Sequence, residues 1–296
     1  MGINMNRRKI AVSILYAVLA AVFYALNMPA SKLLLKHMEP TMLAAFLYLG
    51  AGFGIGALFL FHRHENAENL TKKDLPYTLG MIALDIAAPI LLMYGLLHTT
   101  SANASLLNNF EIVATSLIAL FVFKEAVSKR LWLAILLITI SSSVLSVEDL
   151  SGLHFSWGSL LVLAAAVCWG LENNCTRSIS SKNTYEIVTL KGICSGLGSL
   201  FIALFTGESL PGIPFIGIAL ILGLVAYGLS IFFYIKAQSV LGAAKTSAYY
   251  AIAPFVGALL SFLFLREALT LRYAAAFLIM AAGTVVVVWE TLQSPA

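Results

Sequence analysis

The sequence predicts an all-α membrane protein of ten transmembrane helices, arranged as two inverted five-helix repeats. The 296 residues are 60% hydrophobic and only 11% charged, with a mean hydropathy of +0.92, whereas soluble domains carry roughly 25% charged residues. The apolar residues fall into stretches near the roughly 20 residues that cross a bilayer. Patterns from the first half of the chain recur in the second half, which is the mark of an internal repeat.

Ten apolar stretches predict the membrane spans. In the first half they cover residues 10–30, 41–61, 76–97, 102–123 and 131–147. In the second half they cover residues 155–175, 187–205, 215–235, 243–265 and 273–288. The first stretch is too long for a signal peptide and lacks a clear cleavage site. The connections are short, so we expect no soluble domain.

The basic residues predict the orientation of the chain. Most Lys and Arg residues fall on one side when the N-terminus is placed in the cytoplasm, among them the cluster at 7–9 and the segment 124–130. Because cytoplasmic loops are enriched in Lys and Arg, we expect both termini to be cytoplasmic and the protein to lie in the inner (plasma) membrane. The net charge of +4 is spread over these loops, so no nucleic-acid partner is expected.

Three pairs of segments carry the internal repeat. Residues 21–26 match 166–171, and residues 123–130 match 265–272. The third pair consists of glycines with the same spacing, which we interpret as packing residues: Gly50, Gly54 and Gly56 with Gly192, Gly196 and Gly198. The repeats are predicted to cover residues 1–152 and 153–296. Since each has five spans, the second must enter the membrane from the opposite side, as in the inverted repeats of secondary transporters.

These segments resemble the EamA-type branch of the drug/metabolite transporter superfamily in bacteria. The most specific part is residues 95–105 with 123–125, which recurs at 237–245 and 265–267, and residues 169–177 also resemble a pattern of bacterial members. The resemblance implies ten helices, two repeats and transport of small metabolites, often export of amino acids or related compounds. The first repeat departs from the pattern, because Ile112 stands opposite Pro254.

Ionisable residues inside spans are costly and point to function. Four such residues occur here, Asp85, Glu111, Glu172 and Lys191. Glu172 and Lys191 are predicted to pair, and the alternative for Lys191 is to reach the inner interface. Hydrolase and P-loop motifs are absent from the sequence, and its three cysteines form no CxxC pair. We therefore expect no metal, no cofactor and no enzymatic activity.

Polar and aromatic residues at helical spacing predict a substrate site near the membrane midplane. Matching stripes run along the first and sixth predicted spans, and others along the fourth, eighth and ninth. The residues expected to bind substrate are Tyr24, Asn27, Asn108, Glu111, Trp169, Glu172, Tyr227 and Tyr250. The alternative for each of them is interhelical hydrogen bonding or packing.

Asp85 and Glu111 are candidates for proton coupling. Counted from the turn between the third and fourth spans, both lie near the midplane at similar depth. Two carboxylates in one desolvated site cannot both ionise cheaply, so one of them is suited to carry a proton. Glu111 is favoured because its neighbours are polar. The alternative is a structural Asp85 and purely facilitative transport.

The sequence therefore predicts a secondary transporter, an exporter of a small polar or amphipathic metabolite such as an amino acid or derivative. Alternating access between the two repeats would move the substrate across the bilayer. Three alternatives remain open: an importer of a vitamin or nucleoside-like compound, an intramembrane lipid-modifying enzyme, and a membrane scaffold or sensor. A homodimer is compatible with the sequence.

Overall fold

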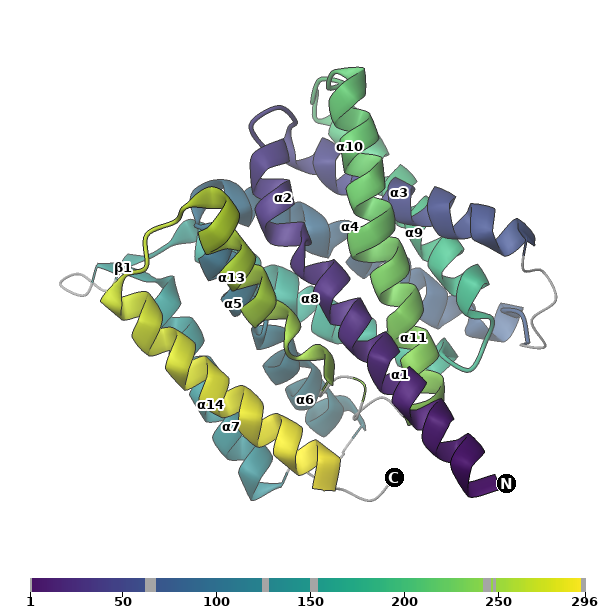
Figure 1. Cartoon of the computed structure of the whole chain (residues 1–296). Helices are drawn as coiled ribbons and strands as arrows, with labels where there is room; N and C mark the ends of the chain where they lie inside the picture. Colours follow the sequence, from purple (N-terminus) through teal and green to yellow (C-terminus); the bar gives the residue numbers. More distant parts are fainter. Residues whose placement is uncertain are drawn as a thin grey trace.

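The computed structural model describes residues 2–61, 68–123, 128–149, 154–241, 246 and 249–293, and nearly all of them are helical. Figure 1 shows long helices packed in a bundle, in which α1 begins and α14 ends at the same end. The predicted limit between the repeats, 152/153, lies outside the described residues. So do Lys124, Glu125 and Lys245 of the repeated segments.

The first half of the chain forms five spans. The first consists of α1 (Gly2–Ala25) and α2 (Asn27–Leu34), the second of α3 (Pro40–Phe61), and the third of α4 (Leu75–His98) after a 3₁₀ turn η1 (Lys72–Asp74). The fourth span is divided into α5 (Ser101–Leu107) and α6 (Phe110–Phe123), and the fifth is α7 (Lys129–Ser146). A short antiparallel hairpin of β1 (Val147–Asp149) and β2 (His154–Phe155) follows.

The second half repeats this order. The sixth and seventh spans are α8 (Trp157–Ile179) and α9 (Thr184–Phe205). The eighth runs through α10 (Ile213–Gly223), the π-helical segment η2 (Leu224–Leu229) and α11 (Ser230–Leu241). The ninth ends in α13 (Ala253–Leu265), and the tenth is α14 (Leu271–Gln293). The ten predicted spans are thus present as helices.

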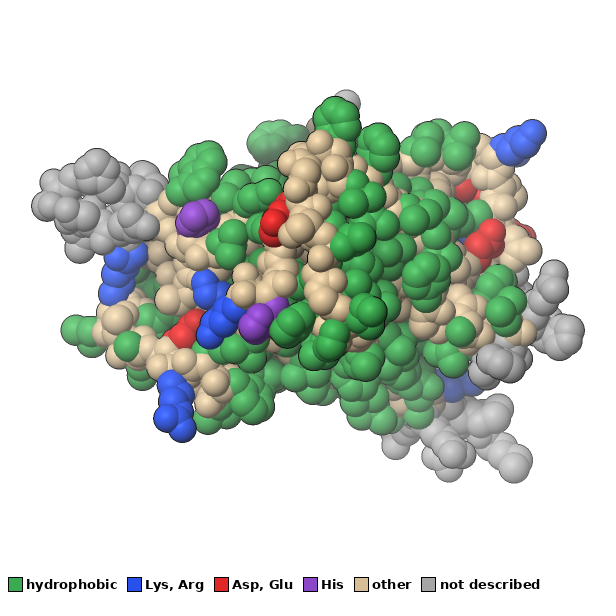
Figure 2. Space-filling model, turned by 90° about the horizontal axis from the view of Figure 1, so that it is seen from above, with side chains coloured by type: hydrophobic (Ala, Val, Ile, Leu, Met, Phe, Trp, Pro, Cys, Tyr) green, Lys and Arg blue, Asp and Glu red, His purple; other side chains and the backbone are tan. Residues whose placement is uncertain are grey.

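Hydropathy separates the spans into two groups. Within the described part of the chain, seven helical stretches are long and apolar enough to cross a membrane; they correspond to the first, second, third, fifth, seventh, eighth and tenth spans. Hydrophobic side chains also cover much of the face shown in Figure 2, as expected of a multi-pass membrane protein. The fourth, sixth and ninth spans are shorter or more polar, and each contributes to the central cavity described below.

The packing of the helices repeats between the halves. The third span packs on the sixth (α4 on α8), and the first packs on the eighth (α1 on α11), which is the same pairing with the halves exchanged. The second span packs on its own counterpart (α3 on α9), and so does the fifth (α7 on α14). This is the pattern of a twofold relation between two five-helix units. Because five is odd, the two repeats are inverted in the membrane.

Glycines allow α3 and α9 to cross at very short distance. A Cβ atom added to Gly52 would lie 2.5 Å from the backbone nitrogen of Ile193. One added to Gly192 would lie 2.8 Å from the carbonyl oxygen of Tyr48 and would overlap the backbone of Gly52. Backbone atoms cannot move aside as a flexible side chain can. Small residues at such a crossing are therefore required for close packing in a membrane.

The fourth and ninth spans are interrupted at corresponding places. The fourth turns at residues 108–109 and the ninth at residues 251–252, an offset of 251 − 108 = 143, against 265 − 123 = 142 for the repeated segments. In the ninth span Pro254 lies in the first turn of α13. In the fourth span Ile112 takes that place, yet the helix still breaks. Asn108 and Asn109 lie at the break, and Asn favours turns over helix interiors.

Two carboxylates cap helices from across the bundle, at the end where α2 stops. Glu208 accepts hydrogen bonds from the backbone nitrogens of Thr41 and Met42, 3.1 and 2.7 Å away, at the start of α3. Glu267 accepts bonds from the backbone nitrogens of Ser101 and Ala102, 2.7 and 2.8 Å away, at the start of α5. Negative charge at a helix N-terminus is favourable, so these contacts tie the connecting segments to both helices.

We expect Gly52→Ala and Gly192→Ala to lower the thermal stability of the purified protein, because the added methyl groups would meet backbone. Overpacking of this kind costs about 1–3 kcal/mol. Gly217→Ala is the matched control, since a Cβ there meets nothing within 4 Å. Thermal unfolding followed by tryptophan fluorescence checks the prediction, and equal midpoints for all three variants would contradict it.

Candidate functional site

A cavity of about 130 Å³ lies between the two repeats. Seven of the eight predicted substrate-binding residues line it: Tyr24, Asn108, Glu111, Trp169, Glu172, Tyr227 and Tyr250. Its volume is close to the roughly 150 Å³ of an apolar protein cavity that takes up benzene. The cavity therefore has room for a small organic molecule.

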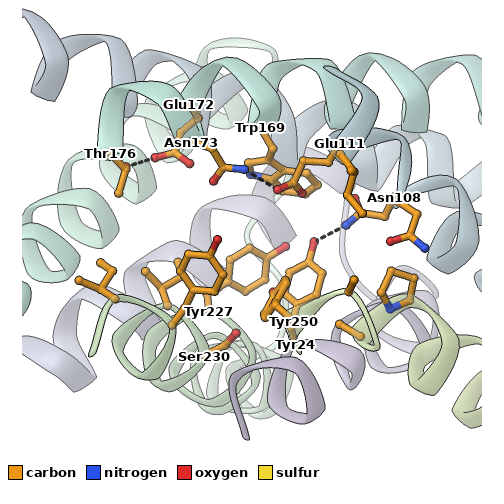
Figure 3. A pocket seen from close by; sticks show the side chains of 18 of the residues that line it. Tyr24, Asn108, Glu111, Trp169, Glu172, Asn173, Thr176, Tyr227, Ser230 and Tyr250 are labelled. Atoms are coloured by element: carbon orange, nitrogen blue, oxygen red, sulfur yellow. Dashed lines mark hydrogen bonds between the residues drawn. The ribbon is translucent and has the colours of Figure 1, made fainter. Parts of the chain in front are cut away.

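The two walls of the cavity differ in chemistry, as Figure 3 shows. One wall carries acidic and amide groups together with Trp169. It is formed by α8, by the start of α6 and by the break before it, and it presents Glu111 and Asn173. The opposite wall carries phenol rings from α1, η2 and the ninth span, those of Tyr24, Tyr227 and Tyr250. A bound molecule would touch polar groups on one side and aromatic rings on the other.

The interrupted helices bring their polar groups to this cavity. The amide nitrogen of Asn108 donates to the hydroxyl of Tyr24 at 3.4 Å, while its Oδ1 atom has no hydrogen-bond partner in the described structure. Asn108 is nevertheless buried. A buried amide oxygen without a partner is costly, so the Oδ1 atom is available to a ligand. The amide of Asn173 donates to the carboxylate of Glu111.

Asn27 does not line the cavity and lies behind it. Its amide nitrogen donates to the hydroxyl of Tyr227 at 3.0 Å, and its oxygen accepts a bond from the hydroxyl of Ser31 at 2.9 Å. Asn27 and Ser31 are both fully buried. The pair therefore holds the ring of Tyr227 in place and does not reach a molecule in the cavity.

A buried ion cluster forms one end of the site. The ammonium group of Lys191 lies 2.9 Å from a carboxylate oxygen of Glu172 and 3.0 Å from one of Asp85. The hydroxyl of Tyr48 donates to Asp85 at 2.7 Å, and that of Thr176 donates to Glu172. The predicted pairing of Glu172 with Lys191 is confirmed. The alternative, in which Lys191 reaches the membrane interface, is wrong, because this side chain is buried.

Asp85 and Glu111 have separate partners. Asp85 is fully buried in the ion cluster and is not among the residues that line the cavity, whereas Glu111 lines it and bonds to Asn173. Within the described contacts, no hydrogen bond or ion pair joins the two carboxylates. The two residues therefore do not form one acidic pair, and Glu111 alone of them faces the space that a substrate would enter.

Sequence reasoning did not single out Tyr48 and Asn173 for the site, although both line the cavity. The signal for Tyr48 was a single hydroxyl in the interior of an otherwise apolar span, since Thr41 lies at the end of that span. Asn173 follows Glu172 directly in a run of polar residues. The stripe at helical spacing passes through Glu172, so it did not indicate that Asn173 also faces the cavity. Among the described residues, no group of three or more His, Cys, Asp or Glu side chains is placed to hold a metal ion.

We expect Lys191→Met to destabilise the protein strongly, because Asp85 and Glu172 would lose their buried counter-charge. Removing one partner of a buried ion pair costs about 3–5 kcal/mol. Adding Asp85→Asn should recover part of the loss, since it removes one of the two unpaired charges. Lys182→Met is the matched control, because its ion-pair partner Glu68 is exposed. The comparison is of thermal midpoints, and a Lys191→Met midpoint no lower than that of Lys182→Met would refute the interpretation.

Comparison with known proteins places this architecture in a family. The family model described as "EamA-like transporter family" matches residues 11–147 and again residues 156–289. A crystal structure shares the fold, with a TM-score of 0.69 and 17% sequence identity over 96% of this chain and 99% of the other.

Two curated relatives are similar along most of their length. An "Uncharacterized transporter" of Methanothermobacter thermautotrophicus is 27% identical over 92% of this chain and 84% of its own. The "Uncharacterized transporter YyaM" of Bacillus subtilis is 25% identical over 82% of each chain. With the family model matching both repeats, this chain belongs to the EamA-like transporter family.

Proposed function

We propose that this transporter exports a small polar or amphipathic metabolite, such as an amino acid or derivative, by alternating access between its two inverted repeats. The observation that carries the proposal is the cavity between the repeats, which is lined by both interrupted spans. In secondary transporters, binding sites lie near the midplane at the repeat interface and are built from discontinuous helices in corresponding positions.

The chemistry of the walls supports an amphipathic substrate. Polar atoms that lack a full set of partners, such as Oδ1 of Asn108, suit a polar head group. The rings of Tyr24 and Trp169 suit an apolar or aromatic part, since their centroids are 6.4 Å apart and the ring planes meet at 84°. The two rings meet edge to face, and both line the cavity.

The arrangement of the ends supports an orientation with both termini in the cytoplasm of an inner-membrane protein. Three basic residues lie in or beside connections at the end of the bundle where α1 begins: Lys72, Lys129 and Lys182. Cytoplasmic connections are enriched in such residues. The caps by Glu208 and Glu267 then lie on the outer side.

Asn108→Ala and Trp169→Ala should reduce transport by at least about tenfold, the effect of losing roughly 1.4 kcal/mol of binding. The measurement is counterflow of labelled metabolites in proteoliposomes, with membrane expression recorded for each variant. Asn103→Ala and Trp157→Ala are the matched controls, because neither residue lines the cavity. Full activity of both cavity variants would remove the cavity as the substrate site. Chemical conversion of the metabolites without counterflow would favour the lipid-modifying enzyme.

We further propose that Glu111 couples transport to protons. Its carboxylate faces the cavity and bonds to the neutral amide of Asn173. The nearby charged groups are Lys191 and Glu172 on α9 and α8, and Asp85 on α4, and these three are paired with one another. A carboxyl group in such surroundings can take up a proton on one side of the membrane and release it on the other.

In Glu111→Gln, accumulation driven by a pH gradient should be lost while exchange of substrate continues at a lower substrate affinity, because Gln keeps the shape of the side chain without its proton. Uptake into liposomes with an imposed pH gradient gives the measurement, and Glu68→Gln, an exposed carboxylate outside the cavity, is the control. If the wild-type protein never accumulates substrate under a pH gradient, transport is facilitative and the coupling role of Glu111 is wrong.

A further inference from the structure

The carboxylate of Glu111 lacks a cationic partner. Its hydrogen bond comes from the neutral amide of Asn173, and no Lys, Arg or His in the described structure lies within ion-pair distance of it. Lys191 is the one basic residue among those that line the cavity, and it is already held between Asp85 and Glu172. An ionised carboxylate withdrawn from water needs a counter-charge, which a bound cation would supply.

Aromatic rings face this carboxylate from the opposite wall, as seen in Figure 3. The centroid of the Tyr24 ring lies 6.0 Å from that of Tyr227 and 5.9 Å from that of Tyr250. The planes of Tyr24 and Tyr227 meet at 72°, so the rings form the sides of a box and do not stack. The faces of Tyr and Trp rings attract cations, and cages of such rings bind ammonium groups.

The balance of charge disfavours an anionic head group at this place. The cavity lining and the cluster behind it contain three carboxylates, Asp85, Glu111 and Glu172, against the single ammonium group of Lys191. The start of α13 has few free N–H groups with which to bind an anion. Pro254 has no N–H group, and the backbone nitrogens of Phe255 and Val256 both donate to the carbonyl oxygen of Ile252. At the start of α6 the place is taken by the carboxylate of Glu111 itself.

From these observations we infer that the cavity selects an organic cation, a substrate whose ammonium head group lies between Glu111 and the rings of Tyr24, Tyr227 and Tyr250. The amide oxygen of Asn108, which has no partner in the described structure, would accept a hydrogen bond from an N–H or hydroxyl group of the same molecule. This inference rests on the proposed function and narrows the proposed substrate to a class of organic cations.

Pairs of probes that differ in charge and share a shape test the inference. Choline and its neutral carbon analogue 3,3-dimethylbutan-1-ol form one pair, and 2-phenylethylammonium and 2-phenylethanol form a second. Isothermal titration of the purified full-length protein should give an affinity at least about tenfold higher for the cation of one or both pairs, as expected for a desolvated cation–π and ion-pair contact. Glu111→Gln should remove that preference and leave the affinity for the neutral partner within about twofold.

Three further variants separate charge from shape. Glu111→Asp should retain the preference for the cation, and Glu68→Gln should leave that preference unchanged. Tyr250→Leu should lower the affinity for the cation more than the affinity for its neutral partner. The inference is overturned if charged and neutral partners bind within about twofold of each other in both pairs. It is also overturned if neither cation shows saturable binding up to about 10 mM, a limit of weak affinity.

Failure of the proposed function would look different from failure of this inference. If labelled choline or 2-phenylethylammonium binds in detergent as described but shows no counterflow in proteoliposomes, the site is a cation site and transport of the bound cation is refuted. If counterflow occurs with neutral or anionic metabolites and neither cation inhibits that counterflow, the proposed transport function is supported and the cationic substrate class is refuted.

Discussion

The close crossing of α3 and α9 sets the position of the two repeats relative to each other. Gly192 allows the crossing, and the residue before it is Lys191, so the contact that joins the repeats also delivers the ammonium group to its partners. Those partners come from both halves, Asp85 on α4 and Glu172 on α8. Tyr48, whose carbonyl oxygen lies at the crossing, donates its hydroxyl to Asp85. The close packing of α3 on α9 and the ion cluster therefore lie side by side in the same contact between the repeats.

The fourth, sixth and ninth spans are interrupted or more polar than the others, and residues of all three line the cavity. In the described part of the chain, seven spans are helical stretches long and apolar enough to cross a membrane. The fourth and ninth spans are interrupted, and the sixth carries more polar residues. Non-helical backbone and ionisable side chains are tolerated within a membrane only where protein or an internal cavity surrounds them. The breaks at 108–109 and 251–252 meet this condition because both adjoin the cavity. The repeat symmetry duplicates the break, whereas the proline that accompanies it occurs once.

Periodicity and repetition were sufficient to predict the ten spans and the inverted repeats, and seven of the eight predicted substrate-binding residues line the cavity. A stripe of polar residues on a membrane helix has to face the interior of the bundle, away from lipid. Periodicity and repetition failed where a contact depends on distance between helices. Asn27 belongs to the correct stripe but bonds to Tyr227 and stays behind the ring. Asp85 was predicted to share a site with Glu111, yet Lys191 pairs with it from another helix. Tyr48 lies in an apolar span without a polar stripe, so the sequence did not show which way its side chain points. Its contact with Asp85 is seen only in the folded structure.

The carboxylates of Glu208 and Glu267 act as borrowed N-caps, since each satisfies the first N–H groups of a helix far from it in sequence. Such a cap is lost whenever the connecting segment moves away. Opening this end of the bundle would leave four amide groups, those of Thr41, Met42, Ser101 and Ala102, to be solvated by water. Hydration of the helix ends would thus accompany any opening there, and the drier closed form would be favoured by osmotic stress. The balance between the two forms would depend on water activity as well as on substrate.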